Sequence, residues 1–333
     1  MFLFRPFRLI FFQVFFFLSS LCEGEISCLN EDGQPVDWFI MYKLPKYKQG
    51  NVGSGVDYMY LDPSLPNWQM SKYLVNTSEG ALGKTLSQLY QRYMSNSSAY
   101  MLYSDAPPVL KYEYNYGHTK GALLFDQFQG FWLTHSIPHF PPFPEMGFGY
   151  PSTGKLYGQN IQCTTYNYKQ FQKISYYTEM AEMAQICAGK SVTVVPRRRL
   201  EKLMSVKGET FLSFAKSHSY VDDIYAGWIA QTLNTDFLVE TWQREAHQLP
   251  SNCSLPYHVM NIKRVSLSEL VTFSSYDDHS KWCVSWEHQT QWTCLGDLNR
   301  ESRQAWRGGG LICTPNSAMY KAFRSAVAWY KNC

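Results

Sequence analysis

The same short motif, a histidine and a lysine separated by one residue, occurs twice in this chain of 333 residues. The first copy is His118 with Lys120, and the second is His279 with Lys281. Residues i and i+2 of a strand point to one face, so each copy presents an imidazole beside an ammonium group. Imidazole attacks phosphorus or transfers protons near neutrality, and lysine is a point charge that suits phosphate oxygens. Two such pairs facing each other predict a centre that cleaves phosphodiester bonds without a metal ion.

Each copy is followed by a second apolar segment that ends on a polar residue, His135 after the first copy and Asn299 after the second. This parallel arrangement predicts two halves of similar order that dock face to face. The candidate catalytic residues expected in one cleft are His118, Lys120, His135, His279, Lys281 and Asn299.

Apolar periodicity predicts the elements that must position these residues. In the first half we expect strands at residues 38–42, 56–60, 98–103, 117–125 and 130–136, with a helix near 82–93. In the second half we expect a helix at 222–233, strands at 237–242, 257–262, 279–286 and 292–298, and a helix at 318–330. Strands mixed with helices in two similar halves predict an α/β (α+β) domain with a pseudo-repeat, each half a mixed sheet with flanking helices.

The first 22 residues have the pattern of a secretory signal peptide. Arg5 and Arg8 precede an apolar run at residues 9–18, and small residues follow it. A membrane anchor is the alternative, but this run is shorter than the ~20 residues that span a bilayer. Three sequons, at Asn76, Asn96 and Asn252, agree with a glycoprotein of the secretory pathway.

Nine cysteines are present, and Cys22 falls in the signal region. The remaining even number indicates disulfides in an oxidising compartment. Neither a Cys-x-x-Cys pair nor a His-Glu-x-x-His motif occurs, so the sequence gives little support to a zinc site. Spacing alone leaves the connectivity open, although Cys294 and Cys313 close the shortest loop.

The net charge of +3 predicts no strong attraction to nucleic acid at pH 7. Eight histidines would make the chain more basic in an acidic compartment. One basic run, residues 197–199 with Lys190 and Lys202, suits the phosphates of DNA. A solvated basic loop is the alternative interpretation of this run.

Several stretches around these residues closely resemble the deoxyribonuclease II family. They are residues 117–121, 130–138, 214–217, 222–228, 250–254, 278–284, 292–300 and 308–310. The stretches 26–28, 42–45 and 255–259 are closer to the beta form of the family than to the alpha form. The resemblance covers nearly all of the chain after the signal region.

The resemblance implies a phospholipase D-like fold and an acid endonuclease that cuts double-stranded DNA, without a cofactor or metal, to 3′-phosphate and 5′-hydroxyl ends. A neutral imidazole would attack phosphorus, and a protonated histidine would donate to the departing 5′-oxygen. Lys120, Lys281 and Asn299 would stabilise the phosphoryl charge. Which of His118 and His279 is the nucleophile stays open.

The resemblance also implies three disulfides: Cys28 with Cys163, Cys253 with Cys333, and Cys294 with Cys313. Cys187 and Cys283 remain, either paired or free. A lysosomal or secreted protein with no stable membrane anchor is expected, and an oligomer is possible.

We expect one domain at residues 23–333, with halves at about 26–165 and 206–333. Between them, residues 166–205 depart from the family pattern and are shorter. This departure suggests an alternative, a splice variant or a DNA-binding glycoprotein with impaired catalysis. Another phosphodiesterase activity, such as that of a phospholipase, is a third reading of the paired motif.

Overall fold

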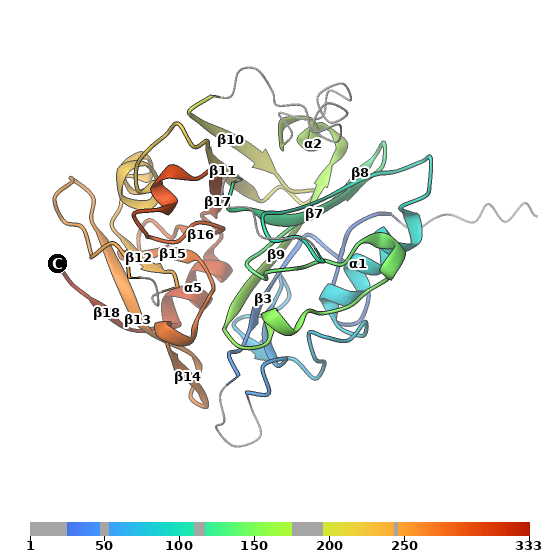
Figure 1. Cartoon of the computed structure of the whole chain (residues 1–333), viewed down its shortest axis with the longest axis horizontal. Helices are drawn as coiled ribbons and strands as arrows, with labels where there is room; N and C mark the ends of the chain where they lie inside the picture. Colours follow the sequence, from blue (N-terminus) through green and yellow to red (C-terminus); the bar gives the residue numbers. More distant parts are fainter. Residues whose placement is uncertain (1–24, 47–52, 110–116, 175–195, 243–245) are drawn as a thin grey trace, which may run out of the picture.

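The computed structural model describes residues 25–46, 53–109, 117–174, 196–242 and 246–333. Figure 1 shows the two halves side by side, the first coloured blue to green and the second yellow to red. The expected signal peptide, Lys190 and Cys187 lie outside the described residues. In the described part, no helix is both long and apolar enough to cross a bilayer.

The first half is built on a seven-stranded sheet in the order β5-β4-β3-β9-β8-β7-β6. Its strands are β3 (Trp38–Lys43), β4 (Tyr58–Leu61), β5 (Gln69–Met70), β6 (Ala99–Ser104), β7 (Lys120–Phe125), β8 (Gln129–His135) and β9 (Gln159–Asn167). Every neighbouring pair is antiparallel, so the expectation of a mixed sheet is wrong for this half. A small hairpin of β1 (Cys28–Leu29) and β2 (Pro35–Val36) stands apart.

The second half is built on a nine-stranded sheet in the order β10-β11-β17-β16-β15-β12-β13-β14, with β18 also paired to β13. Its strands are β10 (Arg198–Met204), β11 (Thr210–Lys216), β12 (Phe237–Glu240), β13 (Val259–Ser268), β14 (Val271–Ser274), β15 (Trp282–Ser285), β16 (Thr293–Gly296), β17 (Gly309–Thr314) and β18 (Val327–Lys331). The β12–β13 pair is parallel, so this sheet is mixed as expected.

The two sheets pack against each other. Helix α1 covers the outer face of the first sheet, and η3 with α4 covers that of the second, whereas α2 and α5 contribute to the core that the sheets share. The helical segments are α1 (Ala81–Arg92), α2 (Tyr168–Ile174), π-helical η3 (Ile224–Ile229), α4 (Ala230–Leu233), α5 (Ser317–Ser325), and the short 3-10 turns η1 (Pro144–Met146), η2 (Ser152–Gly154), η4 (Ser275–Asp277) and η5 (Gln304–Trp306). Alternation along β3 sends Phe39 to the core under α1, and Tyr42 to the core shared with the second half. In β12, Leu238 faces the shared core, whereas Val239 packs under η3.

Several elements differ from the sequence-based expectation. The helix expected at 222–233 is a π-helix at Ile224–Ile229 that continues into a short α-helix at Ala230–Leu233, and the helix expected at 318–330 ends at Ser325. Val327–Lys331 instead forms β18, because its apolar residues complete the edge of β13. Both histidine motifs begin before their strands, since β7 starts at Lys120 and β15 at Trp282. The strands β9, β10, β11 and β17 were not expected.

The segment that departs from the family pattern does not interrupt the first sheet. It contains the end of β9, α2 and β10. Strand β10 pairs with β11 and so belongs to the second sheet. To the described part of the first sheet the segment contributes Tyr166 and Asn167 at the end of β9, and the sheet is continuous, with β9 between β3 and β8.

Among the residues that the structure describes there are three disulfides, and they are the pairs that the resemblance implied. They join Cys28 to Cys163, Cys253 to Cys333, and Cys294 to Cys313. Cys283 is a buried free thiol on β15, in register with Cys294 on β16.

Candidate active site

His118 lies between the halves, and the second half binds its main chain. The His118 N–H donates to the carbonyl oxygen of Gly308 at 2.7 Å. The two chains approach closely here, because a Cβ on Gly117 would lie 3.2 Å from the Gly308 oxygen. The His118 ring Nδ1 lies 2.6 Å from the carbonyl oxygen of Asp297. Since a carbonyl only accepts, Nδ1 carries the hydrogen, and Nε2 of the neutral ring keeps a free lone pair.

His279 is held in the same way by the first half. Its N–H donates to the carbonyl oxygen of Gly158 at 2.9 Å. Its Nδ1 lies 3.0 Å from Nζ of Lys281 and 3.3 Å from the side-chain oxygen of Gln159. The N–H of Lys281 donates to the side-chain oxygen of Asn160 at 2.9 Å. Each histidine motif is therefore fixed by groups from the opposite half.

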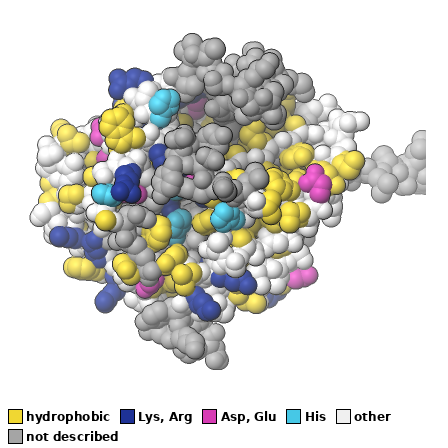
Figure 2. Space-filling view, viewed as in Figure 1, with side chains coloured by type: hydrophobic (Ala, Val, Ile, Leu, Met, Phe, Trp, Pro, Cys, Tyr) yellow, Lys and Arg dark blue, Asp and Glu magenta, His cyan; other side chains and the backbone are white. Residues whose placement is uncertain are grey.

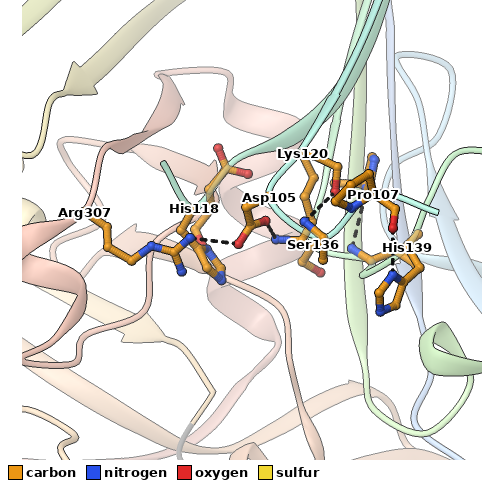
Figure 3. Close-up of polar contacts among 12 residues, drawn as sticks. Asp105, Pro107, His118, Lys120, Ser136, His139 and Arg307 are labelled. Atoms are coloured by element: carbon orange, nitrogen blue, oxygen red, sulfur yellow. Dashed lines mark hydrogen bonds and ion pairs between the residues drawn. The ribbon is translucent and has the colours of Figure 1, made fainter. Parts of the chain in front are cut away.

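A buried carboxylate joins the first motif to the second half. Figure 3 shows Asp105 between Lys120 and Arg307. One oxygen of Asp105 pairs with Nζ of Lys120, and the other lies 3.0 Å from Nη2 of Arg307. The Asp105 side chain has no exposed surface. Both cations are thereby held in fixed positions, and the cluster keeps a net positive charge.

Both catalytic candidate rings lie among cations from the two halves. The pKa of His118 is well below its usual value, first because of burial and then because Lys120, Lys281 and Arg307 repel a positive ring. Burial, Lys281 and Lys120 likewise lower the pKa of His279. Because the lysine of each motif acts on the histidine of the other, the structure brings the two motifs into one centre. The chain between the two motifs is therefore long enough to let them meet in this centre.

His135 lies behind this centre rather than in a cleft. It is fully buried, and its ring packs edge-on against Phe140 at 5.1 Å between centroids. Its Nδ1 accepts from the N–H of Ile137 at 3.1 Å, so Nε2 carries the hydrogen of the neutral ring. Burial first, and then the charge of Lys120, lowers the pKa of His135 to about 3. Among the described residues its Nε2 has no hydrogen-bond partner, and Lys120 at the start of the neighbouring strand acts on the ring through its charge.

Asn299 contributes to the wall beside His279. Its side-chain oxygen accepts from the main-chain N–H of Trp242 at 3.2 Å. The Trp242 ring packs edge-on against the His279 ring, with 4.7 Å between centroids. Asn299 is nearly buried and therefore orders one side of the second histidine.

Asp278 shapes the turn that carries His279. It is fully buried, and its carboxylate accepts from the hydroxyls of Tyr42 and Ser280. Gly158 is needed beside it, because a Cβ there would overlap the Asp278 carboxylate. Asp278 thus fixes the turn that precedes the imidazole.

Sequence reasoning missed the groups that hold the two motifs in place. They are Asp105, Gln159, Asn160, Asp297 and Arg307. Gln159 and Asn160 begin β9, a strand that was not expected from the sequence and whose polar residues Gln159, Asn160, Gln162 and Thr164 are buried. For Asp297, the available signal was the sequence similarity of residues 292–300 to the deoxyribonuclease II family.

The positive charge of the site comes from lysine and arginine side chains. In the part of the chain that the structure describes, no group of three or more His, Cys, Asp or Glu side chains is arranged to hold a metal ion. The chemistry available to these residues is nucleophilic attack and proton transfer by imidazole beside cations that suit a phosphate.

The sequence matches the family described as Deoxyribonuclease II over residues 27–333. It is 46% identical to deoxyribonuclease-2-beta of Homo sapiens, covering 98% of this chain and 96% of that protein. It is 48% identical to deoxyribonuclease-2-beta of Rattus norvegicus, covering 92% and 93%. Against deoxyribonuclease-2-alpha of Sus scrofa the identity is 37%, covering 93% and 91%. The greater identity to the beta proteins agrees with the sequences of residues 26–28, 42–45 and 255–259, which are closer to the beta form.

Two packed sheets, each carrying one histidine-lysine motif at their junction, agree with the phospholipase D-like fold of that family. The match spans both motifs and all three disulfides. The chain belongs to the deoxyribonuclease II family, and it is a DNA endonuclease of the phospholipase D-like fold.

Proposed function

We propose that this protein hydrolyses double-stranded DNA at acid pH, without a divalent metal, and leaves 3′-phosphate and 5′-hydroxyl ends. The observation that carries the proposal is the reciprocal placement of His118 and His279, each tied by its main chain to the opposite half. The scissile phosphate binds between Lys120 and Lys281, whose charges act on both rings.

In the first step, Nε2 of His118 attacks phosphorus, because Nδ1 is committed to the carbonyl of Asp297. A P–N bond forms as the bond from phosphorus to the 5′-oxygen breaks. His279 gives its proton to that oxygen, and the product leaves as a 5′-hydroxyl. The 3′ side of the strand stays attached to His118 as a phosphohistidine.

In the second step, water attacks phosphorus and the P–N bond breaks. His279, now neutral, takes a proton from the water, and the 3′-phosphate is released. Lys120 and Lys281 stabilise the charge on the phosphoryl oxygens in both steps, a role that metal ions fill in other nucleases. Asn299 and His135 act from behind as positioning residues.

The electrostatics of the site support an acid optimum. His279 must carry a proton to act as the acid, yet burial and two lysines hold its pKa well below the usual value. Acid is therefore needed to charge it. A bound phosphodiester adds a negative charge that favours the protonated ring.

We place the enzyme in the secretory pathway, in lysosomes or outside the cell, with residues 1–22 removed and 23–333 as one domain. Three disulfides support an oxidising compartment. The sequon residues Asn76 and Asn96 are exposed, as glycosylation requires, and Asn252 is partly exposed.

The test is purified mature protein with plasmid at pH 5 in excess chelator, beside His118→Ala and His279→Ala. We expect nicking by the parent alone, and 5′ ends that accept phosphate from a polynucleotide kinase without prior phosphatase treatment. Activity that disappears with chelator, or survives in either variant, would contradict the proposal.

A further inference from the structure

The strand ends of the second sheet form a row at the active site. The start of β10 lies beside the end of β11, where Arg198 is in register with Lys216. The end of β11 lies beside the start of β17, where Lys216 is in register with Gly309. At the same end of the sheet, the N–H of Gly296 donates to the carbonyl oxygen of Lys281. The strand ends on this side of the sheet therefore form a row that runs from Arg198 to Lys281 of the second motif.

Arg198 is close to the first motif along this row. Neighbouring strands are ~4.8 Å apart, so two steps put the Cα of Arg198 about 10 Å from that of Gly309. The adjoining Gly308 binds the N–H of His118. Lys216 fixes the row, because its Nζ donates to the carbonyl oxygens of Ala305 and Arg307 at 2.9 and 2.6 Å.

The guanidinium of Arg198 is held in position while the side chain stays exposed. Its Cζ lies 5.4 Å from the ring centroid of Tyr220 and 5.2 Å from that of Trp228. Stacking on aromatic faces orders an arginine. Arg198 also forms a side-chain hydrogen bond with Tyr220, and because a guanidinium has five N–H groups, others remain for a further partner. Within the described ranges, Arg198 has no ion pair with a carboxylate, although Asp222 lies close enough to Tyr220 to influence it.

Residues 197–199 of the basic run therefore lie at the start of the edge strand β10, beside the active site, and do not form a solvated loop. Arg197 next to it is exposed, and its Nε donates to the carbonyl oxygen of Ser219 at 3.2 Å. Arg199 points to the other face and pairs with Glu201 at 2.8 Å. Figure 2 shows separate lysine and arginine side chains spread over the left part of the view, where the second half lies.

We infer that Arg198 binds a phosphate of the DNA backbone a few nucleotides from the scissile bond. This inference rests on the proposed function and extends it from the cleaved phosphate to the strand that enters the site. The fork of guanidinium N–H groups suits two oxygens of one phosphate. Of the two rings beneath it, Trp228 is buried and Tyr220 is partly exposed, and Arg198 lies over both, so we assign the contact to the backbone and not to the bases.

The test compares Arg198→Gln with Arg199→Gln, which removes the same charge from the adjacent position on the other face. Both are made in the His279→Ala background, and binding to a fluorescent DNA duplex is measured at pH 5 over a series of salt concentrations. We expect Arg198→Gln to weaken binding about tenfold, as for the loss of one charge-assisted hydrogen bond pair. The slope of log K against log salt should fall by about one. Arg199→Gln should leave the slope of log K against log salt the same as in the His279→Ala protein.

Equal effects of the two substitutions would overturn the inference, because only net charge would then matter. An unchanged slope with Arg198→Gln would overturn it as well. Thermal melting checks that the variants are folded, which we expect since Arg198 is exposed on an edge strand. The two proposals fail separately: a parent that cuts no plasmid refutes the proposed function, whereas a parent that cuts while both variants bind equally refutes only the Arg198 contact.

Discussion

Nδ1 of His118 lies 2.6 Å from the main-chain oxygen of Asp297, a residue of the other half of the molecule. This contact fixes the ring hydrogen and turns Nε2 into the free nitrogen. His279 has a different environment, since its Nδ1 faces Nζ of Lys281 at 3.0 Å. The two histidines are therefore not equivalent, and the proposed division of nucleophile and acid follows from that difference.

The first prediction separates these roles with the leaving group. His279→Ala should lose on the order of a thousandfold in kcat on normal DNA, within the usual range for general acid catalysis. Replacing the scissile 5′-oxygen by sulfur should restore much of this loss, because a thiolate leaves without a proton. His118→Ala should stay inactive on both substrates. If single-turnover rates showed instead that sulfur rescues His118→Ala and not His279→Ala, the two roles would have to be exchanged.

The second prediction concerns the buried carboxylate of Asp105. Asp105→Asn should lower the free energy of unfolding by about 3–5 kcal/mol, because Lys120 and Arg307 would remain buried without their partner. Urea titration measures this loss. The control, Glu201→Gln, removes a partly exposed partner of Arg199 and should cost less than about 1 kcal/mol. Similar losses in the two variants would show that Asp105 has no special structural role.

The third prediction concerns the pH dependence of stability through His135. Its pKa falls from 6.5 in the unfolded chain to about 3 in the fold, so the unfolded chain takes up the proton first as pH falls. The contribution to stability is complete above 6.5 and is lost between 6.5 and about 3. Relative to His135→Gln, the parent should lose about 1.4 kcal/mol per pH unit in this window. Parallel stability curves for parent and variant would refute the buried neutral ring.

The fourth prediction tests the close approach at Gly158. Gly158→Ala places a Cβ against the Asp278 carboxylate and should displace the turn that carries His279. We expect a loss of kcat of at least tenfold, from misplacement of a reacting group. In Gly149→Ala the new Cβ meets Pro142 at an ordinary 3.6 Å, so activity should be that of the parent. Unimpaired kcat in Gly158→Ala would mean that the turn adapts without moving the histidine.

The sequence located both histidine motifs, because imidazole and lysine at this spacing have a direct chemical meaning. It could not reveal what holds them, since the partners of each motif come from distant parts of the chain. Gln159, for example, reaches His279 across 120 positions. Strand β9 escaped prediction because it lies between the halves and buries Gln162 and Thr164, which would face water in an ordinary strand. The placement of His135 behind Lys120 depends on sheet register, which single-sequence patterns do not define.

The central claim is that His118 becomes covalently attached to the 3′ side of the cut strand while His279 acts as acid and base. The most direct measurement uses His279→Ala with the sulfur-substituted substrate, labelled on the 3′ side of the scissile bond and quenched in alkali. The first step should proceed without the acid, and the second should slow without the base. The account predicts labelled protein with the adduct at His118 by peptide mass spectrometry. No adduct, or an adduct at another residue, would contradict it.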